Sequence, residues 1–141
     1  MKKKNYSFFP EGIYKGQMRG GVAHGKGTYT SGFKGKKGRY KYFYKGDWIN
    51  GKRHGKGKEI MKLIKFVIKY VGGFKNDVTN GHGVLIQRYN GKLYEKFVGQ
   101  FKDSVRTKGK RTDYKEKWKQ EEYRKDPVKR KEIDKYINLI K

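Results

Sequence analysis

The sequence predicts a mainly β protein, an array of glycine-punctuated β-hairpin repeats followed by a helical tail. Three observations lead to this fold class. Twenty glycines accompany 12 tyrosines, eight phenylalanines and two tryptophans in 141 residues, while the apolar share of 33% is low for a thick two-layer core. A glycine-aromatic motif recurs with constant internal spacing. Residues 110–141 contain no glycine and are rich in Lys, Glu and Arg, which marks a separate segment.

The recurring motif is most complete in two segments that lie 30 residues apart. Residues 14–27 and 44–57 both begin with Tyr, place Gly at the third and eighth positions, and end in His-Gly-Lys-Gly. A third copy, residues 70–83, has Asn80 at the His position. A fourth start, residues 97–101, keeps the first half of the motif and has lost the second half. Such self-similarity indicates a repeat architecture.

Each repeat is predicted to form a β-hairpin with its rings on one face. Residues two apart in a strand share a face, so the aromatic residues and the glycine between them lie together. The small glycine lets neighbouring rings lie flat over the backbone. We therefore predict an aromatic core, which comprises Tyr14, Tyr44, Trp48, Tyr70 and Phe74.

Turn and strand signals support the hairpins. Asn50-Gly51 and Asn90-Gly91 favour two-residue turns, because both positions accept positive φ. Ile64, Phe66, Ile68 and Tyr70 alternate with lysines in the segment 64–70, which is the pattern of a half-buried strand.

The tail is predicted to form two helices. Asp113 followed by Glu116 resembles a capping box, and Asp126-Pro127 resembles an N-cap with Pro at the first helical position. Ile133, Tyr136, Ile137 and Ile140 then form an apolar stripe at helical spacing. This stripe either packs on the last hairpin as a cap of the array or binds a partner.

The chain is divided accordingly into three parts. Residues 1–13 form a basic lead-in, residues 14–110 form the repeat domain with repeats starting near 14, 44, 70 and 97, and residues 111–141 form the helical tail. The opening residues lack the apolar stretch of a secretory signal, and no apolar run is long enough for a membrane span.

The motif resembles the MORN repeat, the membrane occupation and recognition nexus. The family pattern, roughly Tyr-x-Gly-x-Trp-x-x-Gly-x-x-His-Gly-x-Gly, matches residues 44–57 at every position, and residues 14–27 differ at Met18. The resemblance covers about residues 14–110 and implies an elongated, twisted antiparallel β-meander with one hairpin per repeat. The repeats are 26–30 residues apart, longer than the family's period, so we expect longer strands or loops at 31–40 and 58–69.

The sequence gives little support for a catalytic site or a metal-binding site. The chain has no Cys, which excludes disulfides and thiolate chemistry. His24 and His54 occupy equivalent positions in successive repeats, about 10 Å apart at two strand spacings, so one zinc ion cannot bridge them. The two Gly-Lys-Gly segments lack the spacing of a phosphate-binding loop. We expect no enzyme activity, no cofactor, no metal and no small-molecule substrate.

Charge indicates an anionic partner. The net charge is +25, and residues 1–109 contain 26 basic and 6 acidic residues, a net charge of +20. Such an excess favours nucleic acid, anionic lipid or acidic protein segments, and the alternative is a solvated lysine-rich surface or a compositional bias. The densest basic clusters are the predicted site for an anionic partner: Lys34, Lys36, Lys37, Arg39, Lys41, Lys52, Arg53, Lys56 and Lys58.

The sequence thus predicts a non-catalytic scaffold that joins protein partners in a larger assembly, such as a cytoskeletal or ciliary complex. MORN repeats occur beside phosphoinositide kinase domains and in junctional membrane proteins, so the alternative is peripheral binding to anionic phospholipid, including phosphoinositides. RNA binding is less favoured, because the repeat uses its rings for packing. We expect a cytoplasmic protein associated with the cytoskeleton or a membrane.

Overall fold

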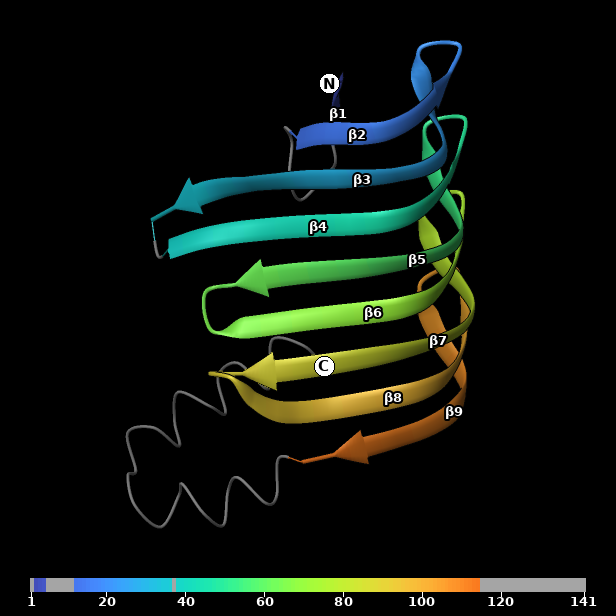
Figure 1. Cartoon of the computed structure of the whole chain (residues 1–141). Helices are drawn as coiled ribbons and strands as arrows, with labels where there is room; N and C mark the ends of the chain where they lie inside the picture. The colour runs from blue at the N-terminus through green and yellow to red at the C-terminus, as the bar shows by residue number, and fades with distance from the viewer. Residues whose placement is uncertain (1, 5–11, 37, 115–141) are drawn as a thin grey trace.

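The computed structural model of the chain describes residues 2–4, 12–36 and 38–114, which form one antiparallel meander (Figure 1). Each strand pairs with the strands before and after it in the sequence. The strands are β1 (Lys2–Lys4), β2 (Gly12–Arg19), β3 (Val22–Gly35), β4 (Gly38–Ile49), β5 (Lys52–Leu63), β6 (Phe66–Lys75), β7 (Val78–Tyr89), β8 (Lys92–Lys102) and β9 (Val105–Asp113). The predicted β-meander of hairpins is confirmed.

Tight turns join the two strands of each repeat. The predicted turn at Asn50-Gly51 is confirmed, with φ of 48° and 80°. The third repeat turns at Asn76-Asp77, where φ is 49° and 71°, although it lacks the glycine. Two consecutive positive φ values match the right-handed twist of the flanking strands, which is why hairpins favour this turn. The predicted turn at Asn90-Gly91, between β7 and β8, is confirmed as well.

The fourth repeat forms a complete hairpin, although its motif has lost the second half. Strand β9 pairs with β8 along its length, and Gly109 lies opposite Gly99 as Gly57 lies opposite Gly46. The His-Gly-x-Gly sequence is absent from β9, and only its last glycine remains. The hairpin therefore survives without the residues that make the motif recognisable.

Glycines stand in register across eight strands and make room for the core rings. The row comprises Gly16, Gly27, Gly46, Gly57, Gly72, Gly83, Gly99 and Gly109. A Cβ added to Gly57 would lie 2.4 Å from the hydroxyl oxygen of Tyr44, and one added to Gly27 would lie 2.1 Å from that of Tyr14. The rings therefore lie directly on the backbone of the next strand, as predicted.

The core is a continuous ladder of aromatic rings on one face of the sheet. All five predicted core residues are buried, with exposures of 3% or less. Trp48 packs edge-on against Tyr14 and Tyr44 at 5.2 and 5.1 Å, and Tyr44 packs against Phe74 at 5.0 Å. The ladder continues through Tyr70 and the fourth repeat. Buried rings that the prediction did not name are Tyr29, Tyr42, Phe66, Tyr89, Tyr94, Phe97 and Phe101.

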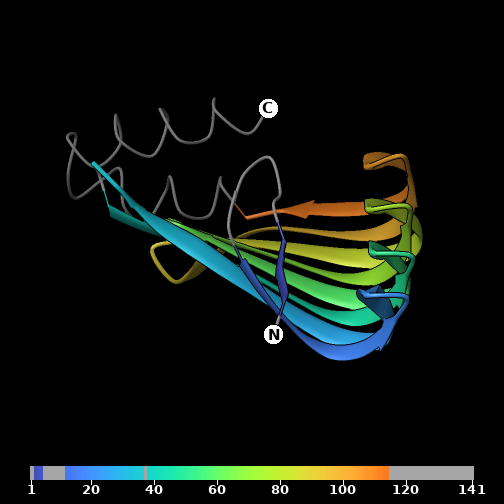
Figure 2. The ribbon, with the colours of Figure 1, turned by 90° about the horizontal axis from the view of Figure 1, so that it is seen from above.

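The sheet bends beside the glycine row, so the hairpin tips fold over the aromatic face (Figure 2). The pairing of each repeat is irregular here, for example between Gly46 and Trp48. Backbone hydrogen bonds then join successive tips: the N–H of Gly51 donates to the carbonyl of Ala23 at 2.8 Å, and that of Asp77 donates to Arg53 at 3.0 Å. The aromatic face is therefore concave, and the opposite face is convex.

The sheet extends beyond the predicted domain of residues 14–110, since β1 and Gly12 precede it and β9 continues to Asp113. The extra residues at 31–40 and 58–69 lengthen β3 to β6, so the longer-strand alternative is confirmed, although Ile64 lies in a turn and not in a strand. Asp113, the predicted helix cap, ends β9. The predicted helices of the tail lie outside the described residues.

Candidate anion-binding face

The convex face is defined by the side chains that alternate with the aromatic core, and we call it the lysine face. Its floor contains Ile13, Thr30, Phe43 and Ile60, which are consecutive cross-strand neighbours. Its basic residues are Lys15, Lys34, Arg39, Lys41, Lys45, Lys58, Lys62, Lys69, Arg88, Lys96 and Lys110. Lysines and aliphatic side chains therefore share one surface that spans the sheet.

Lysine pairs lie directly opposite each other on this face. Lys41 is the cross-strand partner of Lys62, and Lys45 is the partner of Lys58. Lys34 lies opposite Arg39 in the same way. Like charges in directly opposed positions destabilise a sheet. Three such pairs on one face destabilise the fold through repulsion. An anionic partner would remove this repulsion.

Acidic side chains lie mostly elsewhere. Among the described residues, Glu59 and Glu95 lie on the aromatic face, and Asp77 lies in a hairpin turn. Asp47 lies on the convex side at the bend, where its carboxylate bonds Lys26 Nζ and accepts from the backbone N–H of Lys56 at 2.9 Å. Burial raises the pKa of Asp47, but these hydrogen bonds and the charge of Lys26 outweigh it and hold the pKa below its usual value.

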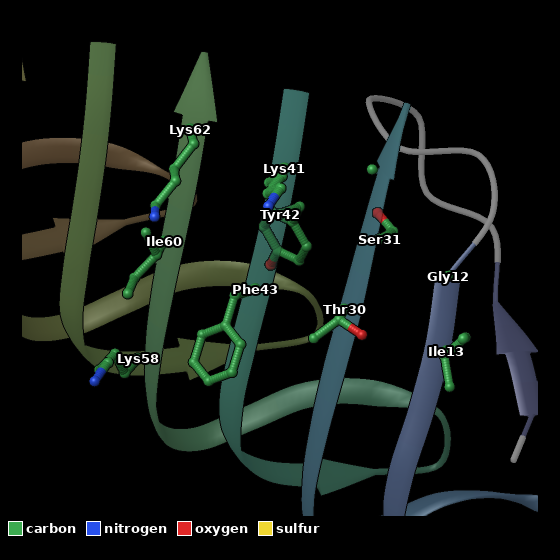
Figure 3. A pocket seen from close by; sticks show the side chains of 11 residues that line it. Gly12, Ile13, Thr30, Ser31, Lys41, Tyr42, Phe43, Lys58, Ile60 and Lys62 are labelled. Atoms are coloured by element: carbon green, nitrogen blue, oxygen red, sulfur yellow. The ribbon is translucent and has the colours of Figure 1, made fainter. Parts of the chain in front are cut away.

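An apolar slot opens between lysines on the first half of the face (Figure 3). Its volume is about 850 Å³. The row from Ile13 to Ile60 crosses β2, β3, β4 and β5, and Lys41 and Lys62 stand at one end with Lys58 at the other. Ile13 remains 41% exposed. The slot therefore offers an apolar contact bounded by cationic groups.

A second groove of about 640 Å³ adjoins the slot through Lys58. It follows five strands over the glycine row, from Gly16 to Gly72. Its lysines are Lys15, Lys26, Lys45, Lys56 and Lys58. Together the slot and the groove place cationic groups on four adjacent strands, β2 to β5.

The nine residues predicted for an anionic partner divide between several places. Four of them, Lys34, Arg39, Lys41 and Lys58, share the lysine face, and Lys56 borders the groove. Lys36 lies in the exposed turn between β3 and β4, and Lys37 lies outside the described residues. Lys52 lies beside the hairpin turn at Asn50-Gly51.

Arg53 lies on the opposite, aromatic face. Its side chain is 12% exposed, and its guanidinium donates to Glu59 Oε1 at 2.8 Å and to Asp77 Oδ1 at 3.3 Å. It also donates to the hydroxyl of Tyr42 at 2.5 Å and lies 5.2 Å from the ring centre of Phe74. Its charge is paired with carboxylates inside the fold, where it links the hairpin tip to the sheet. Arg53 is therefore not part of the candidate surface.

The sequence interpretation missed Lys15, Lys45, Lys62 and the more C-terminal cations of this face. Lys15 and Lys45 each stand between a tyrosine and a glycine, and Lys62 stands between Met61 and Leu63, so a search for dense clusters passes over them. The signal that could have found them is the period of two: in a strand with a buried aromatic face, every second residue belongs to the other face.

His24 makes a contact that links two repeats. The Nδ1 atom of His24 accepts the backbone N–H of Asn50 at 3.3 Å, which joins the first repeat to the turn of the second. Within the part of the chain that the structure describes, no three His, Asp or Glu side chains are grouped as a metal site would need. No helix in that part is long and apolar enough to cross a membrane.

Comparison with known proteins identifies the repeat. The family model of the MORN repeat matches residues 14–32, 44–61 and 70–87. These segments run from the first strand of a hairpin, through its turn, into the second strand in each of the first three repeats. A search of curated proteins gives no match.

Proposed function

We propose that this chain, which belongs to the MORN-repeat family, is a non-catalytic binding module that attaches to anionic phospholipid membranes through its lysine face. The repeats are consistent with a scaffold or binding role, and the family is generally non-catalytic. The observation that carries the proposal is the set of like-charged cross-strand pairs, Lys41 with Lys62, Lys45 with Lys58 and Lys34 with Arg39. A surface on which cations directly face one another is suited to a partner with a high density of negative charge.

The expected energetics fit a peripheral attachment. A lysine or arginine close to an anionic bilayer contributes about 1 kcal/mol, so four lysines together account for roughly a 10³-fold change in affinity. The apolar slot adds a hydrophobic contact at the boundary between headgroups and acyl chains. Single-stranded RNA would need exposed rings for base stacking, whereas most described rings form the buried ladder.

Vesicle co-sedimentation tests the proposal with two variants that lose the same charge. The face variant carries K41Q, K45Q, K58Q and K62Q, and the control variant carries R19Q, K52Q, K75Q and K102Q at the hairpin tips. On phosphatidylcholine vesicles that contain phosphatidylserine, the face variant should bind roughly 10³-fold more weakly than wild type, and the control should lose much less. Equal losses would show a response to net charge alone and would contradict the proposed face.

Protein assembly is the second candidate function, favoured by exposed aliphatic side chains at the hairpin tips such as Ile49 and Val105. A scaffold in a cytoskeletal or ciliary complex should retain its partners through apolar contacts in about 0.5 M salt, where surface charges are screened. Purification of the tagged chain from its own cells at that salt tests this role. Wild type should retain cytoskeletal proteins that the variant V22S/I49S/V105S, altered at the hairpin tips, loses, and loss of all partners from both chains would argue against it.

A further inference from the structure

The four hairpin tips present a repeated pair of side chains on their outer surface. Each turn is flanked by two directly opposed residues, one cationic and one β-branched aliphatic. This holds in every repeat, although their sequences differ. We call these eight residues the tip row: Arg19 with Val22, Ile49 with Lys52, Lys75 with Val78, and Lys102 with Val105.

Folding does not explain the exposure of three of the four aliphatic members, while Val78 is half-buried. If each cation simply packed its stem on the opposite side chain, the aliphatic residue would be covered. Instead Val105 is 62% exposed, Ile49 is 42% exposed and Val22 is 40% exposed. The cationic members are exposed as well. The row therefore combines accessible apolar area with accessible positive charge.

The spacing of the row is regular, because backbone hydrogen bonds join successive tips. The N–H of Gly51 bonds the carbonyl of Ala23, that of Asp77 bonds Arg53, and that of Ser104 bonds Thr79, all between 2.8 and 3.0 Å. Successive tips are thus held two strands apart, about 9.6 Å. Seven residues of an α-helix rise about 10.5 Å. A helix laid across the tips would therefore bring equivalent positions of successive heptads close to successive tips.

The positive charge of the tip row determines which charge a partner helix must carry. The tip row has four cations, while Asp77, the carboxylate in the third turn, already bonds the backbone N–H of Arg53 at 2.8 Å. Among the described residues, Asp103 is the remaining carboxylate in these turns. A partner that covers the aliphatic residues must bring acidic groups beside them, because a buried cation needs a paired charge.

We propose that the tip row is a docking surface for an acidic amphipathic helix of a protein partner, which lies across the four hairpins with one heptad per tip. The proposal deepens the scaffold role and rests on it, and it is independent of the lysine face. The tips lie at one side edge of the sheet (Figure 1), so a helix on them leaves the slot and the groove uncovered.

A designed peptide of about four heptads tests the proposal by fluorescence anisotropy with the full chain. The peptide has Leu and Glu on one helical face with Ala and Gln elsewhere, and a scrambled peptide of the same composition is its control. Wild type should bind the patterned peptide at least about tenfold more tightly than the scrambled one. The variants R19Q/K52Q/K75Q/K102Q and V22S/I49S/V105S should each weaken binding of the patterned peptide about tenfold or more. Variant K41Q/K45Q/K58Q/K62Q should bind it as wild type does.

Four results would overturn the proposal. Equal binding of the two peptides would show that the interaction is general charge attraction. Equal losses of peptide binding in R19Q/K52Q/K75Q/K102Q and K41Q/K45Q/K58Q/K62Q would show the same. Loss of vesicle binding in the variant R19Q/K52Q/K75Q/K102Q but not in the face variant would make a membrane the occupant. A wild-type dimer in analytical ultracentrifugation that only V22S/I49S/V105S dissociates would make a second copy the occupant. Because the peptide assay contains no lipid, the membrane proposal can fail without affecting it.

Discussion

Replacement of Gly57 by alanine is the sharpest test of the way the glycine row supports the core. The new Cβ would lie 2.4 to 2.7 Å from three atoms of the Tyr44 side chain, which is completely buried. Gly57 does not adopt positive φ, so the backbone accepts alanine and the effect reports the ring contact. Overpacking of a core typically costs about 1–3 kcal/mol.

Displacement of the Tyr44 ring adds further losses. The ring packs edge-on against Trp48 and Phe74, and its hydroxyl donates to the carbonyl of Asp47 at 2.9 Å. Each aromatic pair is worth about 0.5–1.5 kcal/mol, and the hydrogen bond about 1 kcal/mol. We therefore expect Gly57→Ala to lower the free energy of unfolding by about 3–5 kcal/mol.

Urea denaturation followed by tryptophan fluorescence measures this loss. Two controls separate its causes. Gly20→Ala adds a Cβ with no atom within 4 Å at φ of 57°, so it should cost only the backbone strain, about 1–2 kcal/mol. Lys58→Ala changes the neighbouring surface residue and should cost less than about 0.5 kcal/mol. The decisive comparison is the Tyr44→Ala background, where Gly57→Ala should cost little. An equal cost in both backgrounds would refute the ring contact as the cause.

Other predictions follow from the same structure. Trp48→Ala should lower stability by about 3–5 kcal/mol, since it removes a ring that joins two repeats; a melting temperature within a degree of wild type would show that the ring is not central. Burial raises the pKa of Tyr70 to about 12 and also raises that of Tyr44. Stability should therefore fall as pH rises above about 10, because the tyrosines of the unfolded chain ionise first. Melting temperature and tyrosinate absorbance should change together, and stability that stays constant up to pH 12 would contradict this. Lys45→Glu should raise the melting temperature in low salt, because it replaces repulsion from Lys58 with attraction, while it weakens vesicle binding; an unchanged melting temperature would argue that this pair does not repel.

The parts of the fold that the sequence predicts are those set by a few neighbouring residues. Asn50-Gly51 marks a turn through the conformations its residues accept, and the spacing from Tyr44 to Trp48 fixes which rings share a face. These features need only a few neighbouring residues, so they are visible in one chain. The fourth repeat is visible in the sequence only through its first half, because β9 keeps one glycine of the motif and its strand is held by pairing with β8.

The candidate site is less predictable, because a face collects residues that are distant in sequence. Lys45 and Lys58 are direct cross-strand partners, yet 12 residues separate them in the chain. Lys52 and Arg53 are adjacent, yet one lies beside the exposed turn and the other bonds Glu59 on the aromatic face. Density of charge along the sequence therefore misplaces part of the site. Register, which depends on pairing between strands, decides which cations stand together.

Lysine-reactivity footprinting on vesicles tests the central claim most directly, because it reports each cation separately in the unaltered chain. The protein is treated with an amine-reactive reagent in solution and on phosphatidylserine-containing vesicles, and the modified lysines are quantified by mass spectrometry. We expect strong protection of Lys41, Lys45, Lys58 and Lys62, with Lys52, Lys75 and Lys102 as reactive as in solution. Protection of the tip lysines with full reactivity at the lysine face would contradict membrane attachment through that face.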